Sequence, residues 1–169
     1  MRNYPNRRSP GMGAMDPALE EVENNQFLQR RRDLYVYEAQ ALALAASATL
    51  TDVVQIEADS SFILQKLAYH AQAPADTALA SAALGLVDSQ RIIAPVAIVI
   101  TDTGSGRQLM PAPIPIPSLF GTGQLPFILP NPRLFMRNST ISIQFTNLDA
   151  TNAYSVRLAF IGYKVYATS

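Results

Sequence analysis

The sequence predicts an all-β protein, an antiparallel β-sandwich or jelly roll of about eight strands, preceded by an extended N-terminal arm and one short helix. Near the C-terminus, Ile141, Ile143 and Phe145 alternate with polar residues, as in a strand with one buried face. After a polar turn the alternation resumes at 156–160. Apolar segments of strand length recur between turn clusters, and core helix patterns are nearly absent. These features together favour two packed sheets.

The expected strands have apolar residues at alternate positions or in short buried runs. In chain order they are 34–50, 53–57, 62–71, 92–101, 107–110, 141–146 and 156–160. Helical patterns compete in 34–50 and 62–71, and we favour strands there because apolar residues alternate. The last two strands are expected to pair with each other as an antiparallel hairpin. The alanine-rich stretch 74–90 predicts a long loop.

The N-terminal region differs from the rest of the chain. Residues 1–15 are rich in Gly, Pro, Asn and Arg, which predicts an extended arm. Asp16 and Pro17 are suited to cap and begin a short helix. Arginines 30–32 would then lie at the helix end that favours positive charge. We therefore divide the chain into an arm with a helix, 1–33, and a β-sandwich domain, 34–169.

The segment 111–132 holds seven of the twelve prolines and belongs to the predicted sandwich domain. Proline at alternate positions enforces extended backbone and removes hydrogen-bond donors, which predicts a rigid extended loop. The loop also carries many apolar residues, so we expect it to dock onto another surface. The apolar residues expected to contact a partner are Ile114, Ile116, Leu119, Phe120, Phe127 and Ile128.

Composition excludes several classes of function. Charged residues make up 15% of the chain, against roughly 25% in typical domains. The low charge predicts either a neutral polar surface or a surface covered by neighbouring subunits. The net charge is zero, so we expect neither nucleic acid nor a membrane as a partner. Without cysteine and with a single histidine, no metal site or cofactor is expected.

Asp102-Thr103-Gly104-Ser105 is the most suggestive chemical motif. Aspartic peptidases place such a carboxylate after an apolar strand, where two aspartates share a proton and activate water. A homodimer could supply the second aspartate, which makes a retroviral-type peptidase an alternative. The same motif is also a common hairpin turn, because Asp bonds its own backbone and Gly permits positive φ. We expect the turn, and no catalytic residue is predicted.

Several segments between residues 50 and 166 together resemble small structural proteins of tailed bacteriophage virions, of the head-decoration (cement) or neck type. They are Val54–Phe62, Ile100–Asp102 with Ser105–Arg107, Leu119–Pro132, Ile143–Asn147 and Leu158–Lys164. The resemblance implies a jelly-roll-like, non-enzymatic virion protein that oligomerises, with a trimer favoured. It would stabilise the head by binding the major capsid protein; a portal or neck protein is the alternative partner.

The arm and the proline-rich loop are the regions expected to contact that partner. In the arm, the expected contact residues are Arg7, Arg8, Phe27, Arg30 and Arg31. In the loop, they are the six apolar residues named above. A neck or tail connector remains an alternative to the decoration protein, and the peptidase that would use Asp102 remains a more distant one.

Overall fold

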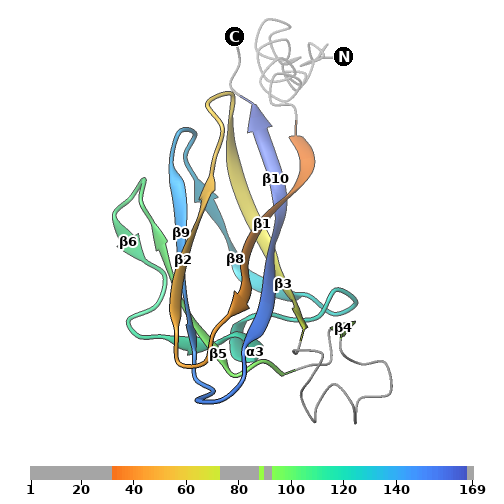
Figure 1. Cartoon of the computed structure of the whole chain (residues 1–169). Coiled ribbons are helices and arrows are strands. Elements are labelled where there is room, and N and C mark those ends of the chain that lie inside the picture. Colours follow the sequence, from red (N-terminus) through yellow and green to blue (C-terminus); the bar gives the residue numbers. More distant parts are fainter. Residues whose placement is uncertain (1–31, 73–87, 90–92, 167–169) are drawn as a thin grey trace, which may run out of the picture.

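The computed structural model describes residues 32–72, 88–89 and 93–166, which form two five-stranded antiparallel sheets packed face to face (Figure 1). Sheet A contains β1 (Arg32–Leu44), β3 (Ser60–Gln72), β4 (Asp88–Ser89), β8 (Phe127–Phe135) and β10 (Tyr154–Tyr166). Sheet B contains β2 (Thr49–Gln55), β5 (Val96–Asp102), β6 (Arg107–Gln108), β7 (Ile114–Pro115) and β9 (Thr140–Asn147). One helical turn, α3 (Ile116–Leu119), follows β7.

The strand order is that of a jelly roll. Sheet A runs β1-β10-β3 with β4 and β8 on the far side of β3, and sheet B runs β2-β9-β5 with β6 and β7 beyond β5. Strands therefore pair from the outside inward, β1 with β10, β2 with β9 and β3 with β8. The chain crosses from one sheet to the other between β1 and β2, between β2 and β3, between β8 and β9, and between β9 and β10. This arrangement of two Greek keys confirms the predicted fold class.

The core fills the space between the sheets because each strand turns alternate residues inward. In β9, Ile141, Ile143 and Phe145 are fully buried, as their alternation predicts. Val156, Leu158 and Phe160 of β10 face them from the other sheet and are also fully buried. Burying one such side chain contributes roughly 1.5–3 kcal/mol, so the two inward rows hold the layers together.

The prediction that the last two strands pair as a hairpin is wrong, although both strands are present. β9 pairs with β2 and β5 in sheet B, whereas β10 pairs with β1 and β3 in sheet A. The connection between them crosses from one sheet to the other. Buried Asn147 fixes this crossing by donating hydrogen bonds to the carbonyl oxygens of Leu44, Ala45 and Asn152 at 3.1, 3.0 and 2.8 Å. Alternation reports that a strand has one buried face and does not identify its partner.

The stretch expected as one strand, 34–50, divides into two. β1 ends at Leu44, a turn follows, and β2 begins at Thr49 in the other sheet. Ala43 and Ser47 have positive φ values of 49° and 54°, which turn the chain although neither residue is glycine. The strand expected at 62–71 is confirmed by β3.

The proline-rich segment is more regular than the predicted loop. It contains β7, α3 and the first part of β8. β8 pairs with β3 on both sides of a break, which lies between Leu64 and Lys66 of β3. Pro130 and Pro132 lie in the unpaired part of β8, where their missing N–H groups cost no ladder hydrogen bond. The two prolines therefore lie in the stretch of β8 that is not paired with β3.

The expected arm, its short helix and most of the 74–90 loop lie outside the described residues. β1 begins at Arg32, which pairs with Val165 of β10, so the sheet includes the last two residues assigned to the arm. Within the described part of the chain, no helix is long and apolar enough to span a membrane.

Candidate functional site

The outer face of sheet A carries a row of apolar side chains that crosses four strands. Leu34 of β1 lies opposite Tyr163 of β10, Tyr163 lies opposite Ile63 of β3, and Ile63 lies opposite Leu134 of β8. Residues directly opposite each other on neighbouring strands share one face of a sheet. Leu34 and Leu134, at the two ends of the row, are exposed over 68% and 53% of their surfaces.

A second row lies beside the first. Val36 is opposite Ile161, Ile161 is opposite Lys66, and Lys66 is opposite Ile128. Val36 and Ile128 are exposed. We call the two rows together the apolar face; its apolar residues are Leu34, Val36, Ile63, Ile128, Leu134, Ile161 and Tyr163, and Lys66 is the charged residue within the second row.

Polar groups bound the apolar face further along the strands. Glu38 of β1 and Arg157 of β10 form an exposed ion pair, 3.4 Å between Oε1 and Nη1. Arg157 is in turn opposite His70 of β3. Contiguous exposed apolar surface with a polar rim is typical of a contact site for another macromolecule. The apolar face is therefore the candidate functional site.

The structure corrects part of the predicted contact set. Ile116 and Phe120 are 0% and 3% exposed, so they anchor α3 in the chain's own core and are not free to bind a partner. The Phe120 ring lies edge-on to the ring of Phe160, with centroids 5.9 Å apart. Sequence alone marked them as partner contacts because a proline-rich segment was expected to lie outside the core.

The other predicted contact residues have different positions. Ile114 and Leu119 are partly buried and line a cavity, and Phe127 of β8 lines the same cavity. Ile128, the next residue along β8, is 65% exposed and belongs to the apolar face. The five arm residues, Arg7, Arg8, Phe27, Arg30 and Arg31, lie outside the described residues.

Most of the apolar face was missed from the sequence. Its members on β1, β3 and β10 were not among the expected contact residues, because the sequence indicated contacts in the arm and the proline-rich loop. One signal was present: β1 reads Leu34-Tyr35-Val36-Tyr37, and β10 carries Ile161 directly after Phe160. A strand that is apolar at both parities has two faces to cover, and a two-layer sandwich covers only one of them.

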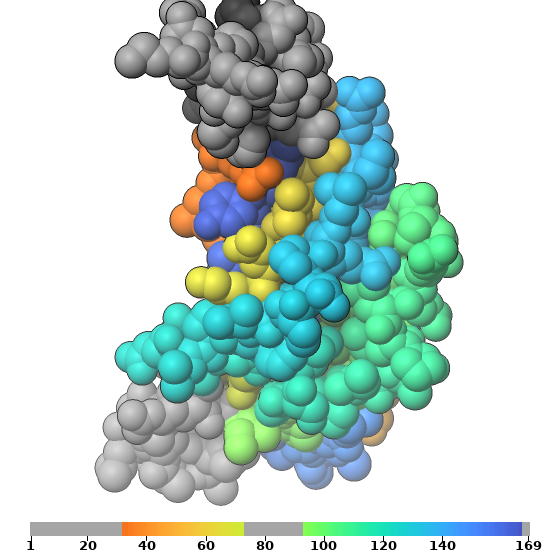
Figure 2. Space-filling view, turned by 180° about the vertical axis from the view of Figure 1, so that it is seen from behind, coloured from red at the N-terminus to blue at the C-terminus, as the bar shows by residue number. Residues whose placement is uncertain are grey.

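The cavity beside β8 has a volume of about 680 Å³. Leu64, Leu67, Ile100 and Phe160 from the two sheets line it, together with the segment that follows β6 and residues of β8, among them Phe127, Leu129 and Leu134. Figure 2 shows the proline-rich segment and β8, in teal to cyan, lying over β3 (yellow) and next to the β5–β6 region (green). The lining is mainly apolar, and Asp102, Arg107 and Arg133 are its charged members.

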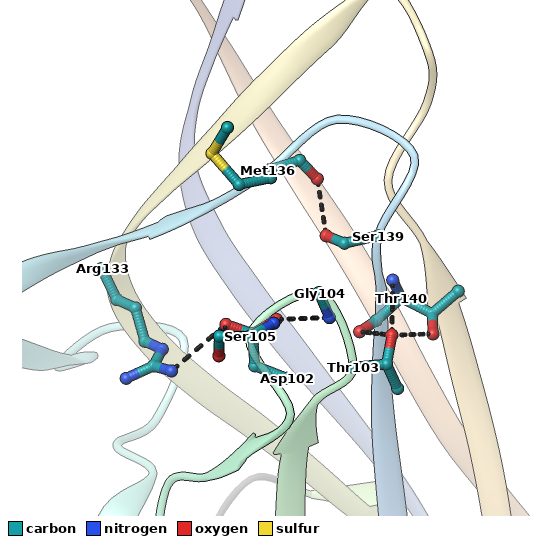
Figure 3. Close-up of polar contacts among 8 residues, drawn as sticks. All are labelled: Asp102, Thr103, Gly104, Ser105, Arg133, Met136, Ser139 and Thr140. Carbon is teal, nitrogen blue, oxygen red and sulfur yellow. Dashed lines mark hydrogen bonds and ion pairs between the residues drawn. The ribbon is translucent and has the colours of Figure 1, made fainter.

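Asp102 closes β5 and organises the following turn (Figure 3). Its Oδ1 accepts the backbone N–H groups of Gly104 and Ser105 at 3.0 and 3.3 Å. Its Oδ2 accepts the Ser105 hydroxyl at 2.8 Å and Nη2 of Arg133 at 3.2 Å. The motif therefore forms the turn expected for it, and an ion pair with Arg133 of β8 ties that turn to the other sheet.

The electrostatics of Asp102 argue against the peptidase alternative. Burial works to raise the pKa of this carboxyl, but hydrogen bonds from Ser105 and Arg133 outweigh burial and hold the pKa below its usual value. A peptidase dyad needs the opposite arrangement, in which two carboxyl groups share one proton. Here both carboxylate oxygens already accept hydrogen bonds from the protein.

A second charged cluster joins β1, β10 and the segment after β2. Nζ of Lys164 lies 2.6 Å from Oε2 of Glu57 and 3.8 Å from the centre of the Tyr35 ring. The Tyr37 hydroxyl donates to the same carboxylate oxygen. Burial works to lower the pKa of Lys164, but the Glu57 carboxylate raises it overall. Lys164 is buried and the Glu57 side chain is partly exposed, so the carboxylate balances the charge of a buried ammonium group.

Comparisons of the chain with protein-family models, with curated proteins and with solved structures find no match. Among the described residues, no group of three or more acidic or histidine side chains is placed to hold a metal ion.

Proposed function

We propose that this chain is a non-enzymatic structural subunit of a tailed-phage particle, which binds assembled heads and stabilises them as a decoration, or cement, protein. The apolar face of sheet A is the observation that carries the proposal. The jelly-roll strand order supports it, since viral capsid domains are among the proteins built on this fold. Fold alone does not define function, so the proposal depends on the surface.

The apolar face has the properties that a repeated lattice contact requires. Its residues come from four adjacent strands that are joined by backbone hydrogen bonds, so the surface is already ordered before a partner binds. A modest contact on one subunit becomes strong when many linked copies bind one particle. Low overall charge fits the same role, because the buried centres of interfaces are depleted in charged residues.

The partner in this proposal is the major capsid protein, and the location is the virion. A portal or neck protein is the alternative partner. The number of copies in purified particles separates the two, since a lattice-wide decoration protein is present in far more copies than a ring at the neck.

Co-sedimentation with heads of the virus that encodes the chain tests the proposal. We expect the wild-type chain to sediment with heads and Leu134→Glu to bind at least about tenfold more weakly, because a carboxylate would be desolvated in the contact. Val53→Glu is the matched control, since Val53 is 54% exposed on sheet B and Leu134 is 53% exposed on sheet A. Thermal unfolding of both variants checks that the fold is intact.

Two results would overturn the proposal. One is a wild-type chain that does not sediment with heads. The other is a Leu134→Glu variant that binds heads as tightly as the Val53→Glu control.

A further inference from the structure

We propose that two copies of this chain join edge to edge through β1, so that sheet A of one copy continues into sheet A of the other. The inference rests on the proposed assembly function and deepens it, because it names the contact between copies. The partner is a second copy of this chain, and the contact is antiparallel β-strand pairing.

The backbone of β1 has one open side. β10 pairs along one side of β1, and no strand pairs along the other side within the described residues. The Gln40 N–H donates to the Asp52 side chain of β2 at 2.8 Å, so it points away from β10. Because N–H and C=O groups alternate along a strand, those of Leu34, Val36 and Glu38 point to the same open side.

This edge lacks two kinds of residue that commonly protect a strand edge against pairing. β1 is 13 residues long and contains neither proline nor lysine. Its open part exposes the apolar side chains of Leu34 and Val36. Long apolar edges of this kind are templates for another strand. β8, in contrast, carries Pro130 and Pro132.

Only the first half of β1 is available. The Gln40 N–H already donates a hydrogen bond to the Asp52 side chain. Beyond it, the pairing with β10 shifts register between Ala41 and Leu44, and Ala43 has a φ of 49°. In Figure 1, β1 and β2 are separated at the end where β1 begins and come together toward the β1–β2 turn. The open edge therefore spans 32–38.

Charge complementarity selects one register. When two copies of this edge pair antiparallel about Tyr35, Leu34 lies opposite Val36 of the other copy and Arg32 lies opposite Glu38 of the other copy. The two-fold symmetry makes each of these pairs twice. Shifting the register by two residues in one direction places Leu34 opposite Glu38, and shifting it in the other direction places Arg32 opposite Val36. Either shift separates Arg32 from Glu38 of the other copy.

Glu38 can pair with Arg157 of its own chain and with Arg32 of the other copy. In its own chain it pairs with Arg157 at 3.4 Å, and both side chains are largely exposed. An ionised carboxylate accepts several hydrogen bonds, so Arg32 of the other copy can approach the same group.

The pairing also explains how the apolar face would be used. The two-fold axis of an antiparallel pair centred on Tyr35 is perpendicular to the sheet, so the outer faces of both copies lie on the same side. Two apolar faces then form one continuous surface, which binds a repeated lattice at two points. A two-fold pair differs from the trimer that the resemblance implies.

Sedimentation velocity of the full-length chain over a range of concentrations tests the pairing. We expect a dimer for the wild type and about a tenfold or greater weakening for Arg32→Glu and for Glu38→Arg, since each puts like charges opposite each other. The double variant Arg32→Glu/Glu38→Arg should restore the dimer. Arg157→Gln, which removes only the partner of Glu38 within the chain, should remain dimeric.

A wild-type chain that is monomeric or trimeric, or a double variant that stays as weak as the single ones, overturns the pairing. Circular dichroism of each variant establishes that the chain is folded. A monomeric chain that still sediments with heads would refute the β1 pairing and leave the decoration function standing. A dimer that does not bind heads would refute the function and leave the pairing standing.

Discussion

At the residue scale, Asp102 has a structural role that its local sequence only partly indicates. An Asp-Thr-Gly-Ser run is compatible with a peptidase aspartate and with a hairpin turn, because both use a carboxylate followed by a flexible residue. The deciding partner is Arg133, which is 31 residues further along the chain and belongs to the other sheet. A cation at 3.2 Å holds the carboxylate ionised, so Asp102 joins two layers of the sandwich.

Replacing Asp102 by Asn should destabilise the fold. Asn keeps the shape but loses the charge that Arg133 and the Ser105 hydroxyl bind, and we expect a loss of about 1–3 kcal/mol in the free energy of unfolding. Urea denaturation at pH 7 measures it. Asp52→Asn is a suitable comparison, because Asp52 also accepts backbone N–H groups but forms its bonds at an exposed site. Equal effects of the two substitutions would contradict the role given to Arg133.

The same substitution should change the pH dependence of stability. The pKa of Asp102 is lowered in the folded state, so its contribution is fully present above the unfolded value of about 3.9. That contribution is lost as the pH falls through the folded pKa. Wild type should therefore lose more stability than Asp102→Asn as the pH falls from about 5 towards 2. Urea midpoints across this range measure the difference, and parallel curves would refute it.

At the element scale, the pairing of β3 with β10 depends on a glycine. The register between these strands shifts next to Gly162, where a Cβ atom would lie 2.0 Å from the carbonyl oxygen of Ile63. Such a distance forces the two backbones apart. Gly162 also lies opposite Tyr35 of β1, so the disturbance would reach the middle of sheet A.

Gly162→Ala should therefore cost about 3 kcal/mol or more in the free energy of unfolding. Gly106→Ala is the matched control: its φ is +65°, but no atom lies within 4 Å of the added Cβ, so about 1–2 kcal/mol of backbone strain is expected. Guanidinium denaturation compares the two. If Gly162→Ala costs no more than Gly106→Ala, the close approach of β3 and β10 is not what requires glycine.

At the scale of the whole molecule, the described residues form a sandwich with a core of their own. The described core is closed by strands that begin at Arg32, and β1 already has its full partner in β10. The charge and composition of the arm predict contacts outside the domain. The apolar face belongs to the domain itself, so we expect the arm and the domain to be separable.

Removing residues 1–31 should leave a chain that unfolds cooperatively, with a midpoint within a few degrees of that of the full chain. In the proposed function, the shortened chain should bind heads more weakly than the full chain but still measurably, because the apolar face is intact. Differential scanning calorimetry and co-sedimentation measure the two effects. Loss of the cooperative transition would show that the domain needs the arm, and complete loss of binding would assign head binding to the arm alone.

How much of the molecule could be predicted is clearest from particular residues. Ile141, Ile143 and Phe145 were expected in a strand with one buried face, and they lie in one, because alternation is a local property that a short peptide already carries. The pairing of that strand with its successor was wrong, because hydrogen bonds between strands do not depend on separation along the chain. Ile116 and Phe120 were placed outside the core for a similar reason: proline content predicts backbone shape and not the layer in which it packs.

The sequence by itself determined the class of fold, the Asp102 turn and the weakly charged character of the chain, since each depends on residue type and near-neighbour spacing. Only the tertiary structure decided which strands share a sheet, which apolar residues stay exposed and which edge is open. Those properties arise when strands distant in sequence come together, as when Leu34, Tyr163, Ile63 and Leu134 form one row across sheet A. The candidate site consists of two such rows, so it appears only after folding.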